Sequence, residues 1–112
     1  MNELWDLYDI NGVPLDITIE RGNPLLSHQY HKVLHIWIYN EFGEFLVQKR
    51  APHLKWNPNI WATTTGSIIS GAQNEKEEAY RELQEELGLD NTMVDLDFYT
   101  QIIIGQSIAY IY

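Results

Sequence analysis

The stretch RELQEEL, residues 81–87, decides the fold predicted for this chain. On a helix, Glu82, Glu85 and Glu86 project within an arc of roughly 100°, because each residue advances about 100° around the axis. Gly88 follows, and glycine suits the left-handed conformation just past a helix C-terminus. Glu85 and Glu86 are therefore expected in the last turn, beside unpaired carbonyl groups, where the helix dipole disfavours negative charge.

The helix that carries this stretch is predicted to begin at about Glu75 and to end at Leu87. Asn74, followed by Glu77 three residues later, resembles a capping box at its start. The sector beside the glutamates is apolar and can pack on a sheet; it contains Ala79, Tyr80, Leu83 and Leu87. One face of the helix thus anchors it while the other stays open.

The open face carries carboxylates that repel one another. Glu78 lies one turn before Glu82, which lies one turn before Glu86, and like charges at this spacing are unfavourable. A charge run of this kind is often only a solvated surface. Hard divalent ions such as Mg²⁺ or Mn²⁺ prefer carboxylate oxygens, however, and Arg81 can bridge to a neighbouring carboxylate and hold the array in register. A site for a divalent cation explains the array of carboxylates better than a solvated surface does.

Composition limits the classes of protein that fit. The chain has 112 residues, enough for one domain and one core, and 45% of them are apolar. The net charge of −9 argues against a general binder of nucleic-acid polymers or of anionic membranes. Cysteine is absent, so disulfides and thiolate metal sites are excluded. With neither a leader-like start nor a long apolar run, we expect a cytoplasmic protein that does not enter a membrane.

Strands are predicted on both sides of the helix, from alternating apolar residues and from β-branched and aromatic residues. We expect 32–40 and 44–50 to form a hairpin of two buried strands. The predicted strand segments are ELWDLYD (3–9), PLDITIE (14–20), KVLHIWIYN (32–40), EFLVQKR (44–50), IWATTTGSIISG (60–71), MVDLDFYTQIII (93–104) and SIAYIY (107–112).

The segment 81–89 resembles the second half of the Nudix box, the signature of the Nudix (MutT-like) hydrolase superfamily. The full pattern is Gly, five residues, Glu, seven residues, then Arg-Glu-apolar-x-Glu-Glu-x-Gly-apolar, and all the specified positions of the second half are present. The resemblance implies an α/β fold, a Nudix-type α/β/α sandwich with a mixed sheet. It predicts a single domain over 1–112, with N-terminal strands and a loop over 1–29 and a C-terminally short core over 30–112.

The same resemblance implies hydrolysis of a diphosphate linkage in a nucleoside diphosphate derivative or a similar small molecule, with Mg²⁺ or Mn²⁺ as cofactor. Glu82, Glu85 and Glu86 would be metal ligands. Glu85 or Glu86 would also activate water, and Arg81 would orient the glutamates. A metal cluster fits this chemistry because it neutralises the diphosphate and lowers the pKa of a bound water.

The first half of the box departs from the pattern. Counting back from Arg81 without a gap places Gln73 at the expected Glu and Ser67 at the expected Gly. With one extra loop residue, Gly66 is the box glycine and Ala72 replaces the Glu. In both registers a carboxylate is missing, which motivates an alternative: a weakened module that binds a ligand without turnover. Glu78, on the same helical face, is a candidate to compensate.

Four residues outside the helix are candidates for substrate binding or for the core. Lys49 and Arg50 close a predicted strand, where they can meet substrate phosphates or helix carboxylates, or simply be strand-end charges. Trp56, in a polar loop, is a candidate to stack on a base or ring, whereas Trp61 is predicted to be core.

The histidines and the chain end suggest two further expectations. His31 and His35 would face the same side of a strand and could meet a metal there, but the simpler interpretation is that they are hydrogen-bonded strand histidines. The segment around them also resembles the prenyl-diphosphate isomerase branch of the superfamily, but the cysteine and histidine of that branch have no counterpart, with Ser67 where the histidine is expected. The apolar run ending at Tyr112 predicts a homodimer or other strand-mediated association.

Overall fold

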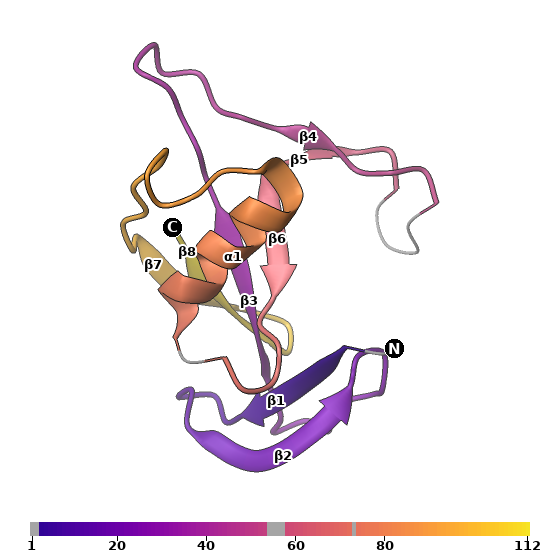
Figure 1. The fold of residues 1–112 in the computed structure, drawn as a ribbon. Helices are drawn as coiled ribbons and strands as arrows, with labels where there is room; N and C mark the ends of the chain where they lie inside the picture. The colour runs from indigo at the N-terminus through magenta and orange to yellow at the C-terminus, as the bar shows by residue number, and fades with distance from the viewer. Residues whose placement is uncertain (1–2, 54–57, 73) are drawn as a thin grey trace.

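The computed structural model describes residues 3–53, 58–72 and 74–112. A mixed β-sheet with one helix packed on it forms the centre, and an N-terminal hairpin and a short β-ribbon lie at its ends (Figure 1). In chain order the elements are β1 (Leu4–Tyr8), β2 (Pro14–Glu20), β3 (His31–Ile36), β4 (Gln48–Lys49), β5 (Trp61–Ala62), β6 (Thr64–Ser67), α1 (Glu75–Leu87), β7 (Thr100–Ile104) and β8 (Ser107–Ile111).

The central sheet has the strand order β6-β3-β8-β7. Strand β3 runs antiparallel to β6 and parallel to β8, and β8 runs antiparallel to β7. The sheet is therefore mixed, as expected. Parallel neighbours need a long crossover, and the chain between β3 and β8 supplies it with β4 to β6, α1 and β7.

Helix α1 packs on one face of this sheet and has the predicted bounds. The Asn74 side chain caps its start by accepting a hydrogen bond from the backbone N–H of Glu77, and Gly88 ends it in the left-handed conformation. The described part of the chain thus supplies the mixed sheet and one helical layer of the expected sandwich. No helix in the described ranges is long and apolar enough to cross a membrane. The buried core consists of Leu34, Ile36, Ile68, Ala79, Leu83 and Leu96.

The N-terminal hairpin, β1 and β2, forms a separate two-stranded sheet that is docked on the central one. Its strand β1 meets the chain after β6, where the backbone N–H of Ser70 donates to the carbonyl of Leu4. A bridge between Tyr8 and Tyr30 attaches the other end of β1 to the approach of β3. The hairpin therefore lies below the end of β6 that leads into α1 (Figure 1).

The prediction of a second buried strand over 44–50 is wrong. Only Gln48 and Lys49 are in a strand, paired with β5, and Leu46 and Val47 are exposed. Both edges of β3 are occupied by β6 and β8, so this segment cannot join the central sheet beside β3. A hairpin does form, but beyond the end of β3, where Tyr39 pairs with Phe45.

Two other expectations need correction. Trp61 is not core: it lies in β5, within the ribbon that projects from the sheet, and 66% of it is exposed. The strand predicted over 93–104 begins only at Thr100. Before it, Leu96 leaves strand geometry to enter the core against the helix, where its backbone N–H donates to the Tyr80 hydroxyl.

Candidate active site

The helix caps fix which carboxylates share a face of α1. Because Asn74 and Gly88 set both ends of the helix, the residues one turn apart on its polar side face the same region. Glu78 and Glu82 are buried there, whereas Glu85 and Glu86 are exposed. The array predicted from the sequence is therefore present, with two carboxylates held inside and two near solvent.

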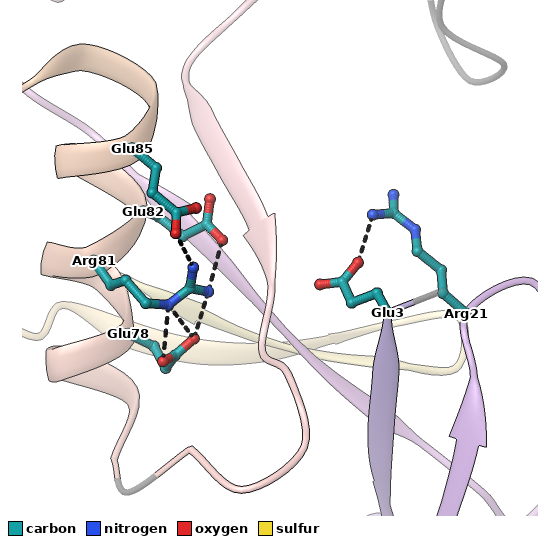
Figure 2. A network of polar contacts seen from close by, with 6 residues as sticks. All are labelled: Glu3, Arg21, Glu78, Arg81, Glu82 and Glu85. Carbon is teal, nitrogen blue, oxygen red and sulfur yellow. Dashed lines mark hydrogen bonds and ion pairs between the residues drawn. The ribbon is translucent and has the colours of Figure 1, made fainter. Parts of the chain in front are cut away.

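Arg81 connects three of these carboxylates (Figure 2). Its Nε and Nη2 donate to the Glu78 carboxylate, with an Nη2 to Oε2 distance of 2.7 Å. Nη2 also donates to Glu82 at 3.1 Å, and Nη1 donates to Glu85 at 2.7 Å. The hydrogen bonds to Glu78 are the main cause that raises the pKa of Arg81 well above its ordinary value. The guanidinium thus holds the array in register by charge-assisted hydrogen bonds.

Glu82 lies in the least favourable electrostatic position of the array. Burial raises the pKa of its carboxyl above the ordinary value, and the neighbouring charges of Glu86 and Glu85 raise it further. The charge of Arg81 acts in the opposite direction. A buried carboxylate among like charges is the kind of group whose ionised form a bound cation stabilises.

Gly66 of β6 makes the close approach to this carboxylate. A Cβ built on Gly66 would lie 2.7 Å from Cδ of Glu82 and 2.9 Å from its Oε2, which no real contact allows. While Glu82 keeps this position, the strand needs a residue without a side chain at this point. Two registers were possible for the first half of the box. The contact with Glu82 favours the register in which Gly66 is the box glycine and Ala72 stands where the acid is expected. Gln73, the residue at that position in the other register, lies outside the described residues.

A single cavity joins the helix to the rest of the candidate site. Its volume is about 1010 Å³, and it is open to solvent. Its lining includes carboxylates from the helix and from the N-terminal hairpin, together with three cationic side chains. The charged residues in the lining are Glu3, Arg21, Lys49, Arg50, Glu82, Glu85 and Glu86.

The structure brings two of the predicted substrate-binding residues to this cavity. Lys49 belongs to β4 and Arg50 follows it, and both line the cavity together with the helix glutamates. Trp56 lies outside the described residues. Gln48, which the sequence did not single out, is oriented toward the helix: its Nε2 lies 3.4 Å from an oxygen of Glu86 and 3.4 Å from the Thr64 hydroxyl.

Sequence reasoning also missed the contribution of the N-terminal hairpin. Glu3 and Arg21 flank β1 and β2, and both line the cavity. No motif links them to the helix, because they lie far from it along the chain and only the docking of the hairpin brings them there. The only local signal was an opposite charge at each end of a predicted hairpin.

His31 follows the simpler of the two interpretations, that of a hydrogen-bonded strand histidine. Nε2 of His31 lies 2.9 Å from the Ser107 hydroxyl, and its ring stacks on Trp5 at a centroid distance of 4.0 Å. Burial, followed by the charge of Arg21, lowers the pKa of His31 to about 4. Burial also lowers the pKa of His35, which lines the cavity. Both rings are therefore neutral at neutral pH.

The side chains fit a hard divalent cation by their chemistry, because Glu82, Glu85 and Glu86 offer only oxygen donors. In the described ranges, no three His, Asp or Glu side chains converge closely enough to hold a metal ion in this conformation. The guanidinium of Arg81 takes part of the donor set, since it binds Glu82 and Glu85. Glu85 and Glu86 are exposed, so a change of rotamer can turn them toward Glu82.

Comparisons with known proteins identify the family of this chain. Residues 29–104 match the family of the NUDIX domain. The chain is 39% identical to the Nudix hydrolase lmo0368 of Listeria monocytogenes over 84% of its own length, and 54% of that protein is covered. It is 26% identical to an isopentenyl-diphosphate Delta-isomerase of Paenarthrobacter aurescens, with 84% of this chain and 51% of that protein covered. The chain therefore spans about half the length of these curated relatives.

A solved structure shares the fold. The crystal structure of DR0079 from Deinococcus radiodurans superposes with a TM-score of 0.83, and the match covers 97% of this chain and 69% of that one. The two sequences are 21% identical. The arrangement of sheet, helix and hairpin is therefore one that a solved protein also adopts.

Proposed function

Because the chain belongs to the Nudix family, we propose that it hydrolyses a diphosphate linkage in a nucleoside diphosphate derivative or a similar small molecule, using Mg²⁺ or Mn²⁺. The observation that carries this proposal is that one cavity is lined both by Glu82, Glu85 and Glu86 from α1 and by cationic side chains from other elements. A carboxylate cluster suits a divalent cation, and the cations suit the phosphates of its substrate.

In this proposal each glutamate has a stated task. Glu82, Glu85 and Glu86 hold the metal ion through their carboxylate oxygens. When bound, a divalent ion neutralises the charge of the diphosphate and lowers the pKa of a water molecule beside it. A carboxylate oxygen of Glu85 or Glu86 accepts the proton as water attacks phosphorus and the bridging P–O bond breaks. The exposure of both side chains gives them the freedom to reach that water.

Arg81 acts as a positioning residue. Its guanidinium binds Glu78, Glu82 and Glu85 at once, so it sets the spacing of the carboxylates without itself having to meet the substrate. Lysine cannot replace this planar fork, because it is a single point charge. Glu78 fixes the guanidinium from the buried side.

Lys49, Arg50 and Trp56 are proposed to bind the substrate. Lys49 and Arg50 would contact phosphate oxygens, since both line the cavity that contains the glutamates. Trp56 would stack on a base or ring, as predicted from its place in a polar loop.

The test is a substrate screen with Mg²⁺ or Mn²⁺ over nucleotide sugars, dinucleoside polyphosphates, oxidised nucleotides and prenyl diphosphates. The native chain is compared with Glu85→Gln and Glu86→Gln, which keep the shape of the side chain but remove its charge. We expect metal-dependent release of a phosphate-containing product that both variants reduce at least about a hundredfold, the magnitude typical of general base catalysis.

Glu77→Gln is the matched control. It makes the same change in the same helix, but Glu77 is exposed and is not among the residues that line the cavity. Equal activity of Glu77→Gln and the native chain shows that the loss in the other two variants is specific. Metal-dependent binding without turnover would instead support the ligand-binding alternative. Rearrangement of a prenyl diphosphate without hydrolysis would support an isomerase, the activity named for one relative.

A further inference from the structure

The open end of the N-terminal hairpin lies at the mouth of the cavity. Glu3 and Arg21 stand at this end, and both line the same cavity as the helix glutamates. Their backbones are paired, with the N–H of Arg21 donating to the carbonyl of Glu3 at 2.8 Å. Their side chains form an ion pair, also at 2.8 Å, and Figure 2 shows this pair across from the carboxylates of Glu82 and Glu85.

The hairpin is fixed to the chain that leads into α1, so this position is defined. The carboxylate of Asp6 accepts hydrogen bonds from the Ser70 hydroxyl at 2.7 Å and from the backbone N–H of Gly71 at 3.1 Å. Trp5 of the same strand is 8% exposed and stacks on His31 of β3. Arg21 is thus held beside the cavity by a docked element and does not belong to a loose arm.

The guanidinium of Arg21 also contributes, after burial, to lowering the pKa of His31 on β3. This effect adds to the geometric observation that the same cavity surface includes Glu3, Arg21 and Glu82.

The ion pair between Arg21 and Glu3 is easily exchanged. The side chain of Arg21 is 54% exposed, and pairs at such positions contribute little to stability because water screens them. A guanidinium carries five N–H donors and can bind two phosphate oxygens at once. The hydrogen bond from Arg21 to Glu3 is made through Nη1 alone. A phosphate that enters this cavity is therefore a stronger partner for Arg21 than Glu3.

We propose that Arg21 is a phosphate-binding residue of this cavity, and that its guanidinium exchanges Glu3 for a phosphate oxygen of the diphosphate substrate. The inference rests on the proposed function and deepens it. It adds a binding residue that directly follows β2, in a part of the chain outside the residues 29–104 that match the domain family. The end of the hairpin then contributes to the substrate site together with Lys49 and Arg50.

This exchange predicts opposite effects for the two members of the ion pair. Loss of Arg21 removes a phosphate ligand, whereas loss of the Glu3 charge removes a competitor for Arg21 and a source of repulsion. If the pair only clasped the two ends of the hairpin, removing either partner would have the same effect on the site. The sign of the Glu3 effect therefore separates binding from a structural role.

The experiment is titration calorimetry of methylenediphosphonate, a diphosphate analogue that cannot be hydrolysed, in the presence of Mg²⁺. We expect Arg21→Gln to weaken its binding about tenfold and Arg21→Lys to weaken it less, since lysine keeps the charge but not the fork. Glu3→Gln should bind the analogue as tightly as the native chain or a few times more tightly. Lys76→Gln is the control, because it makes the same charge change at an exposed helix position that does not line the cavity.

The outcomes separate this inference from the proposed function. Binding by Arg21→Gln at the strength of Lys76→Gln overturns the inference, as does equal weakening by Arg21→Gln and Glu3→Gln. If Glu85→Gln and Glu86→Gln still abolish metal-dependent binding in that case, the proposed function stands. If the native chain binds the analogue without any dependence on metal, the proposed function fails and the assignment of Arg21 fails with it. Thermal unfolding of each variant shows whether a loss of binding follows from a loss of structure.

Discussion

Gly66 and Glu82 show how one missing side chain positions another. Glycine is needed at residue 66 because the carboxylate of Glu82 occupies the space where a Cβ would lie. The atoms in the way belong to a side chain, so they can move, but the carboxylate must then leave its place beside Arg81. A substitution at Gly66 should therefore impair the candidate active site more than it lowers the stability of the fold.

Gly66→Ala is expected to lower kcat/KM at least about tenfold, equivalent to about 1.4 kcal/mol of transition-state stabilisation, and to weaken Mg²⁺ binding. The free energy of unfolding should change by less than about 1 kcal/mol, because alanine also restricts the unfolded chain. Steady-state kinetics, metal titration and urea unfolding measure the three quantities. An unchanged Mg²⁺ affinity would show that Glu82 stays in place.

His31 makes stability depend on pH. Its pKa is lowered to about 4 in the folded chain from 6.5, so between these values the unfolded state binds a proton that the folded state does not. The contribution of His31 to stability is therefore fully present above about pH 6.5 and is lost as the pH falls toward about 4. Each pKa unit corresponds to about 1.4 kcal/mol, which sets an upper limit of about 3.5 kcal/mol on this contribution.

His31→Phe keeps a ring against Trp5 but cannot take up a proton. We expect the native chain to lose more stability than this variant between about pH 6.5 and about pH 4, by up to about 3.5 kcal/mol. Urea unfolding at several pH values measures the difference, and acidic residues common to both chains cancel from it. Parallel pH profiles for the two chains would contradict the burial of a neutral histidine.

At the scale of elements, helix α1 could be predicted in full from local signals. Its bounds, its cap at Asn74 and its C-terminal glycine at Gly88 agree with the sequence, because capping and period depend on residues a few positions apart. The strands were harder to predict from the sequence. Residues 44–50 have a strand composition, yet pairing needs a free edge, and β3 has both edges occupied.

Asn74→Ala tests the helix cap. The Asn74 side chain accepts the N–H of Glu77 at 2.8 Å, and loss of such a cap costs about 1 kcal/mol. We expect the free energy of unfolding to fall by about that amount in urea titrations. Asn91→Ala, the same substitution at an exposed position beyond the helix, should change it by less than about 0.5 kcal/mol. Equal effects at both positions would argue against the cap.

For the whole molecule, the strand expected to drive association is not a free edge: β8, which ends near Tyr112, pairs with β3 on one side and with β7 on the other, so the exposed edge on that side is β7. It is last in the strand order, and Ile102, Ile103 and Ile104 along it are exposed. An apolar strand at a sheet edge can pair with another chain. Homodimerisation or other strand-mediated association stays a prediction: light scattering should show a molecular mass that rises with concentration, and Ile103→Lys should reduce the rise. A constant monomeric mass over a wide concentration range would contradict it.

The sequence by itself determined the helix, its caps, the direction of Glu82, Glu85 and Glu86, and the resemblance to the family. All of these depend on residues within a few turns of one another, whose geometry the backbone fixes locally. Only the tertiary structure decided that Gly66 meets Glu82, that Trp61 is exposed, and that Arg21 reaches the cavity. These facts depend on which strand edges and faces remain available once the chain has packed, and short-range patterns do not contain that information.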